Sequence, residues 1–123
     1  YEPAEKPGQV FVYNADEHVN AIIKKLFPAV LEGPAVTGDC FVCDSEKRDW
    51  IKRRFGAMSC DMESAAVAST AYKCGIGTVA LRRISDDAGN DADEAYRSQT
   101  AVIETDMIDM VLAAVDALAE EER

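Results

Sequence analysis

The chain has 123 residues, of which 23 are acidic and 13 are basic, so its formal net charge is −10. Such an acidic protein repels phosphate groups, which argues against binding to nucleic acids or to anionic membranes. No apolar run approaches the ~20 residues that span a bilayer. Because 48% of the residues are hydrophobic, the chain can build a core, and we expect a small domain or a piece of a larger one.

The N-terminal half alternates between helical and extended patterns. Apolar residues recur at helical spacing over residues 19–30, which predicts an amphipathic helix. Asn14 or Asp16 is its expected N-cap, and Gly33-Pro34 its expected stop. Residues 35–42 then predict a buried strand that a Gly-Asp pair interrupts.

A second helix is predicted over residues 45–55, and it carries the only basic cluster of the chain. The expected role of this cluster is a solvated helix face, and a local anion site is the alternative. The cluster consists of Lys47, Arg48, Lys52, Arg53 and Arg54.

The C-terminal half begins with a short predicted strand over residues 57–61. It runs into a predicted helix over residues 62–71 made almost wholly of small side chains. Because small side chains let a helix approach its neighbours closely, we expect this helix to be central and buried, with Gly75 at its end. Residues 78–84 are the strongest strand candidate, followed by a polar loop over 85–94 and a long helix over 98–118.

Helices that alternate with short apolar strands predict an α/β unit with a largely parallel sheet. At most three strands are visible, which is few for a sheet that must be covered on both faces. The pattern therefore fits half of a fold.

The four cysteines are Cys40, Cys43, Cys60 and Cys74. They indicate free thiols in a reducing cytoplasm rather than a disulfide framework. Cys40 and Cys43 form a C-x-x-C sequence, but the strand predicted across them would point residues three apart to opposite faces. We therefore expect small buried hydrophobes there rather than redox or zinc chemistry, and no other cluster predicts a metal site.

Three stretches hold residues that a purely structural segment would avoid. The first is the Gly-Asp pair of residues 38–39. In the second, Asp61 can cap the following helix, but Glu63 opens a helix predicted to be buried, where a charge needs a partner or a ligand. In the third, Arg82 interrupts an apolar strand, and Glu63 is its natural partner. Asp86 ends that strand, where open α/β sheets bind ligands; a solvated acidic loop is the alternative.

Together these stretches resemble the purine nucleoside phosphorylase/nucleosidase superfamily, most closely its methylthioadenosine/S-adenosylhomocysteine nucleosidases. The resemblance is carried by Gly38-Asp39-Cys40-Phe41-Val42, by Met62-Glu63-Ser64-Ala65-Ala66-Val67-Ala68 and by Arg82-Arg83-Ile84-Ser85-Asp86-Asp87-Ala88. They occur in the family's order and at roughly its spacings. The resemblance implies that residues 1–123 are the C-terminal portion of one domain, without its N-terminal half. The implied fold is three-layer α/β/α, with a mixed, largely parallel sheet and a long C-terminal helix.

The resemblance also implies roles for individual residues. Phe41 would stack on the purine, and the Val42 backbone would hydrogen-bond the edge of the base. Met62 and Glu63 would hold the ribose, with Glu63 taking its hydroxyls and Arg82 steadying Glu63.

At the N7 side of the purine, the resemblance places Ser85 and Asp86. A purine leaves poorly as an anion, so protonation at N7 by Asp86 as general acid would assist its departure. The sequence departs from the nucleosidase pattern at Asp61, where a longer acid is usual, and at Arg83, where a small residue is common.

The implied reaction is cleavage of the N-glycosidic bond of a purine nucleoside. Hydrolysis of methylthioadenosine or S-adenosylhomocysteine to adenine and the thioribose is preferred, and a phosphate-dependent purine nucleoside phosphorylase is the alternative. The alternative from another class is a catalytically incomplete fragment that serves as a nucleoside-binding or assembly module.

The family's other half supplies the residue that activates water, or the phosphate site, so we expect this fragment alone to be inactive. No cofactor is expected, although phosphate would be a co-substrate for a phosphorylase. The expected partners are a small-molecule purine nucleoside, further copies of the chain in a homo-oligomer, and a companion N-terminal chain.

Overall fold

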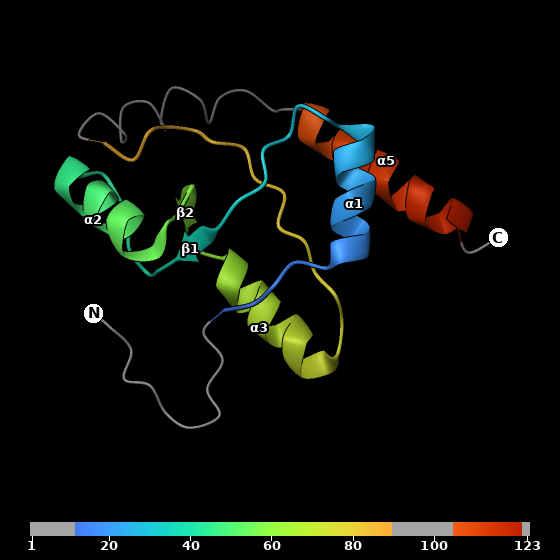
Figure 1. The fold of residues 1–123 in the computed structure, drawn as a ribbon, viewed down its shortest axis with the longest axis horizontal. Helices are drawn as coiled ribbons and strands as arrows, with labels where there is room; N and C mark the ends of the chain where they lie inside the picture. Colours follow the sequence, from blue (N-terminus) through green and yellow to red (C-terminus); the bar gives the residue numbers. More distant parts are fainter. Residues whose placement is uncertain (1–11, 90–104, 122–123) are drawn as a thin grey trace.

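The structure, a computed structural model, describes residues 12–89 and 105–121. Figure 1 shows two short strands near the centre, with one helix at one end of the molecule and two helices side by side at the other. The elements of the described residues are α1 (Glu17–Leu26), β1 (Ala35–Thr37), α2 (Ser45–Phe55), β2 (Ser59–Asp61), α3 (Ser64–Cys74) and α5 (Thr105–Glu121).

The two strands pair in parallel, and α2 connects them. In the register of this pair, Ala35 lies opposite Ser59 and Thr37 lies opposite Asp61. Parallel neighbours need such a crossover connection, so β1, α2 and β2 form a βαβ unit. The α/β class and the parallel pairing expected from the sequence are confirmed for the described strands.

Local signals set the ends of α1. Asp16 is its N-cap, and its carboxylate accepts hydrogen bonds from the backbone N–H groups of His18 and Val19, both at 3.0 Å. The predicted stop at residues 33–34 is wrong, because the helix ends at Leu26. Pro28 disfavours a helical conformation for the residue before it, which ends the helix earlier.

The predicted bounds of α2 are confirmed. Asp44 caps its start by accepting a hydrogen bond from the Glu46 N–H at 2.8 Å, and Gly56 ends it in the left-handed conformation with φ 64°. Gly75 ends α3 in the same way with φ 68°, as the sequence predicts. The start of α3 is two residues later than predicted, so residues 62–63 lie in the turn before the helix.

Two strand predictions are wrong. The strand predicted over residues 35–42 ends at Thr37, and the chain bends at residues 39–40. Residues 78–84 form no strand, and the Thr78 carbonyl accepts a hydrogen bond from Asp16 N–H at 2.8 Å. A strand exists only where a neighbouring strand completes its ladder of hydrogen bonds, whatever the local propensity.

The core of the described residues is small. Ile22 and Ile23 of α1 and Ala114 of α5 are buried, and these two helices contact each other. The expectation that α3 is central and buried is wrong within this chain, because none of its residues is buried and Val67 is 62% exposed. Small side chains permit close packing, but burial needs a covering layer, which the described residues do not supply over α3.

The predicted C-terminal helix is present, with a later end. It runs over Thr105–Glu121, three residues beyond the predicted end, whereas its predicted start at residue 98 lies outside the described residues. The acidic loop predicted over 85–94 is irregular over residues 85–89; its remainder also lies outside them. Among the described helices, none combines the length and hydropathy that a membrane crossing requires.

Candidate active site

The candidate site begins at the carboxyl ends of the two parallel strands. Thr37 ends β1, Asp61 ends β2, and the Thr37 hydroxyl donates a hydrogen bond to Asp61 Oδ1 at 2.6 Å. The Gly38 N–H donates to the Asp61 carbonyl at 3.0 Å. This is the edge at which open α/β sheets bind ligands.

Asp61 also organises the start of α3. Its Oδ1 accepts hydrogen bonds from the backbone N–H groups of Glu63 at 3.3 Å and Ser64 at 3.1 Å, and the Ser64 hydroxyl donates to Oδ2. Asp61 therefore binds the first N–H group of α3, as the capping interpretation expects, although the N-cap residue itself is Glu63. The Glu63 side chain makes no capping hydrogen bond.

Arg82 joins the two acids of this turn. Its Nη2 lies 3.2 Å from Glu63 Oε2, and its Nε lies 3.1 Å from Asp61 Oδ2. Both nitrogens also donate to the Ser64 hydroxyl, at 2.9 and 3.0 Å. The Glu63–Arg82 pair expected from the sequence is confirmed, and Asp61 is a second partner that the sequence reasoning did not assign to Arg82.

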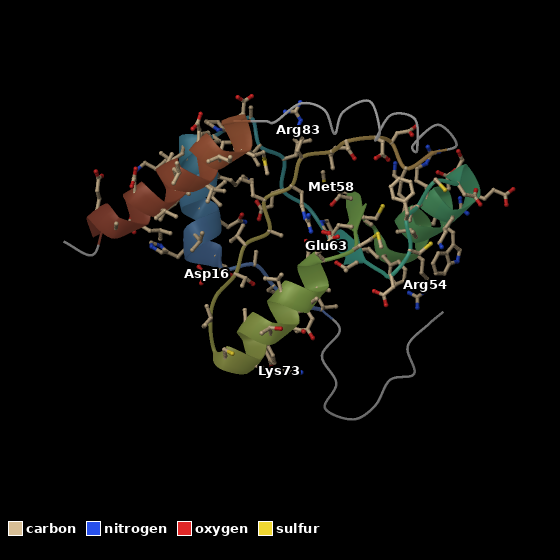
Figure 2. The ribbon with its side chains drawn as sticks, turned by 180° about the vertical axis from the view of Figure 1, so that it is seen from behind. Asp16, Arg54, Met58, Glu63, Lys73 and Arg83 are labelled. Carbon is tan, nitrogen blue, oxygen red and sulfur yellow. The ribbon has the colours of Figure 1, made fainter. Side chains whose placement is uncertain are left out.

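The two acids differ in exposure. The Asp61 side chain is 10% exposed, whereas that of Glu63 is 67% exposed. Figure 2 shows Glu63 at the end of α3 that faces the strands, with Lys73 at the opposite end. Asp61 is therefore the less exposed anchor of Arg82, and Glu63 presents its carboxylate at the surface.

Hydrogen bonds stabilise the charged form of Asp61. Burial by itself raises the pKa of this carboxyl group, but hydrogen bonds from Ser64 and Thr37 and the positive charge of Arg82 outweigh it. The net result is a pKa below the ordinary value for Asp, so Asp61 stays ionised well into the acidic range.

Asp86 lies in the segment after Arg82, near Cys60 of β2. The Ser85 hydroxyl donates to Asp86 Oδ2 at 2.6 Å, and the Ala88 N–H donates to Oδ1 at 2.8 Å. The pKa of the Cys60 thiol is raised, first by burial and then by the negative charges of Asp86 and Asp61. Asp86 is therefore close enough to β2 for its charge to act on Cys60, the residue before Asp61.

A contact from α2 holds the loop of Asp86. Arg48 Nη1 lies 3.3 Å from Asp87 Oδ2, and the Gly89 N–H donates to Asp87 Oδ1 at 2.9 Å. The sequence reasoning assigned Arg48 to a solvated face, and nothing in a run of basic residues distinguishes it. Thr37 was missed too, because its position opposite Asp61 depends on the strand register.

Two of the three predicted base-binding residues, Phe41 and Val42, lie on the segment that leaves the same sheet edge. Val42 is buried, whereas Phe41 is 41% exposed, and neither belongs to a strand as the sequence analysis expected. Met62, in the turn before α3, is 45% exposed. Phe41 and Met62 are therefore partly open to solvent in the described chain, whereas Val42 is not.

A separate hollow of about 340 Å³ lies between α3 and the segment before α1. Tyr13, Asp16 and Tyr72 help to line it, and none of the predicted site residues does. Within the described residues, no group of His, Cys, Asp and Glu side chains could hold a metal ion.

Comparison with known proteins identifies the family. The family model described as the phosphorylase superfamily matches residues 3–117, so the chain belongs to this superfamily. The chain is 30% identical to a 5'-methylthioadenosine/S-adenosylhomocysteine nucleosidase of Exiguobacterium, over 98% of this chain and 54% of the relative. It is 31% identical to the protein of the same name from Chromohalobacter salexigens, over 96% and 53%.

Solved structures agree with this assignment. An S-adenosylhomocysteine nucleosidase from Streptococcus pyogenes, in complex with 5-methylthiotubericidin, matches with a TM-score of 0.80 and 28% identity, over 96% of this chain and 52% of that one. A futalosine hydrolase of Helicobacter pylori matches with a TM-score of 0.77 and 26% identity, over 92% and 50%. The resemblance and the fold class stated from the sequence are confirmed.

The chain spans about half the length of the curated relatives it matches.

Proposed function

We propose that this chain carries the base-binding and ribose-binding part of an enzyme that cleaves the N-glycosidic bond of a purine nucleoside. The preferred reaction is hydrolysis of methylthioadenosine or S-adenosylhomocysteine. The observation that carries the proposal is the Glu63–Arg82–Asp61 cluster at the carboxyl edge of the parallel strands. The names of the relatives support the choice of substrate.

Glu63 would act on the ribose. Its exposed carboxylate is steadied through Oε2 by Arg82, and it would accept hydrogen bonds from the ribose hydroxyls, while Met62 packs against the sugar. As the bond to the base breaks, the ribose becomes oxocarbenium-like. A carboxylate held in place on the sugar hydroxyls stabilises that positive charge without having to reorganise.

Asp86 would act on the leaving group. In the proposed mechanism it donates a proton to purine N7, so that the base leaves as a neutral molecule. Ser85 and the Ala88 N–H each bind one oxygen of this carboxyl group, which fixes its orientation. General acid catalysis of this kind contributes about 10²–10⁴-fold to the rate.

The remaining contacts would orient the base. Phe41, partly exposed after β1, would stack on the purine, and the Val42 backbone would hydrogen-bond its edge. No resident cofactor enters this mechanism. Phosphate would be the co-substrate if the enzyme is a phosphorylase, so phosphate dependence separates the two reactions.

Native mass spectrometry of the purified protein is the first experiment. A companion polypeptide bound to the 13.4 kDa chain would support a two-chain enzyme, whereas copies of this chain alone would support the non-catalytic module. Release of adenine from methylthioadenosine is then measured with and without phosphate, with futalosine as a second substrate. Release without phosphate is the expected result, and strict phosphate dependence would favour the phosphorylase.

The general acid role of Asp86 is tested by Asp86→Asn in the protein sample that releases adenine from methylthioadenosine. We expect turnover to fall by about 10²–10⁴-fold, with the affinity for a non-hydrolysable nucleoside analogue nearly unchanged. Asp109→Asn, at an exposed position of α5, is the matched control and should retain full activity. Equal losses of turnover and affinity in Asp86→Asn would contradict the assignment.

A further inference from the structure

The loop between β1 and α2 carries two exposed thiols beside a lysine. Cys40 and Cys43 are both free and exposed. Lys47, in the first turns of α2, donates a hydrogen bond from Nζ to Cys40 Sγ at 2.8 Å. In its protonated form, the Cys40 thiol can donate to the Phe41 carbonyl, which lies 3.4 Å away. The proposed nucleoside chemistry uses neither sulfur.

The structure removes the reason for which the sequence disfavours thiol chemistry here. The sequence predicts a strand across Cys40 and Cys43, and residues three apart on a strand point to opposite faces. The strand instead ends at Thr37, and the chain bends at Asp39 and Cys40. Cys40 and Cys43 therefore lie in an irregular segment without a sheet ladder to hold their side chains apart.

Both sulfurs also lie within electrostatic range of the same ammonium group. The pKa of Lys47 is raised, chiefly by its hydrogen bond and charge interaction with Cys40 and, more weakly, by Asp44 and Cys43. A thiolate beside a lysine is the reactive form of cysteine in thiol–disulfide exchange.

We propose that Cys40 and Cys43 form a thiol–disulfide switch, in which Lys47 assists Cys40 as the attacking thiolate and Cys43 is the resolving thiol. The oxidant is a low-molecular-weight disulfide such as glutathione disulfide. The exchange chemistry is independent of the proposed nucleosidase function, whereas its effect on base binding rests on that function.

The reaction has two balanced steps. Cys40 thiolate attacks one sulfur of glutathione disulfide, so a Cys40–glutathione bond forms while the disulfide breaks, and one glutathione leaves as its thiolate. Cys43, after losing its proton to solvent, attacks Cys40 Sγ and displaces the second glutathione. The two cysteines are oxidised to a disulfide, and glutathione disulfide is reduced to two glutathione molecules.

The switch would act on the segment that holds the base-binding residues. Phe41 and Val42 are the two residues between the cysteines, so a Cys40–Cys43 disulfide would close a small ring around them. Oxidation would therefore restrict the segment proposed to stack on the purine.

The test treats the protein with glutathione disulfide at neutral pH and follows each cysteine by mass spectrometry. We expect the native chain to form a Cys40–Cys43 disulfide and Cys43→Ser to retain glutathione on Cys40. In the Cys43→Ser background, Lys47→Met should slow formation of that adduct about threefold or more, because it removes the ammonium group that contacts Cys40 Sγ. Lys52→Met, at an exposed position of the same helix, is the matched control and should react at the parent rate.

Three results would overturn the proposal. The first is that Cys74 or Cys43 reacts with glutathione disulfide as fast as Cys40 does. The others are a rate of adduct formation that Lys47→Met leaves unchanged, and a glutathione adduct on the native chain that never resolves into a disulfide. A measurement on the unaltered chain adds a further check. At 1 M salt, where the screening length is about 3 Å, the rate at Cys40 should fall towards that of Cys74, and a salt-independent ratio of the two rates would contradict activation by Lys47.

Discussion

Replacement of Asp61 by Asn tests the anchor of the candidate site most directly. Asn keeps the shape of the side chain but removes its charge and one of its two acceptor oxygens. The native carboxylate accepts from Thr37 and Ser64 and pairs with Arg82. In the variant, an NH2 group replaces one of the two carboxylate oxygens. This group cannot accept a hydrogen bond from the donors that face it.

The magnitude follows from the burial of the two partners. Breaking a fully buried ion pair costs about 3–5 kcal/mol, but Arg82 is 38% exposed, and water compensates part of the loss. We therefore expect Asp61→Asn to lower the free energy of unfolding by about 2 kcal/mol at neutral pH. With a urea m-value of ~2 kcal/mol/M, the unfolding midpoint should fall by about 1 M.

The pH dependence supplies the second readout. Because the pKa of Asp61 is lower in the folded state than its ordinary value, its contribution to stability is complete above the unfolded pKa of about 3.9. It is lost as the pH falls through the folded pKa. The difference between native protein and Asp61→Asn should therefore be constant near neutral pH and shrink below about pH 4.

Urea unfolding followed by circular dichroism over a series of pH values measures both effects. Asp109→Asn, exposed on α5, should change the free energy of unfolding by less than about 0.5 kcal/mol. The reasoning is refuted if Asp61→Asn is equally mild at neutral pH, or if its effect persists undiminished in acid.

Two further substitutions test neighbouring features. Thr37→Val removes the hydroxyl that donates to Asp61 and accepts from the Ala65 N–H at 3.0 Å. It should lower the free energy of unfolding in urea by about 1–2 kcal/mol. Thr37→Ser, which keeps the hydroxyl, should lower it by less. Gly75→Ala places a β-carbon on a residue with φ 68° and should lower the thermal unfolding midpoint through a cost of about 1 kcal/mol; an unchanged midpoint would mean that another conformation ends α3 at no cost.

The sequence alone predicts the features that depend on neighbouring residues. Both ends of α2 and the glycine that ends α3 follow from local capping chemistry, and the same chemistry narrows the N-cap of α1 to Asn14 or Asp16, of which the structure has Asp16. The pairing of Glu63 with Arg82 also follows, because an arginine in an apolar segment needs an acid. The early end of α1 also has a local signal, which is Pro28.

Tertiary structure decides the features that depend on distant partners. Residues 78–84 have the composition of a strand, yet no described strand completes their ladder. The opposition of Thr37 and Asp61 depends on strand register, and the contact between Arg48 and Asp87 joins positions 39 residues apart. No local pattern encodes such pairings.

The exposure of α3 is a further feature that the local sequence does not decide. Its small side chains permit close packing on every face, but they do not determine which segment covers it. The chain by itself determines the helices, their caps and the acidic residues of the candidate site. How these residues are brought together, and how much of them stays exposed, is decided by contacts that form only in three dimensions, because burial and pairing belong to the assembled surfaces and not to the local sequence.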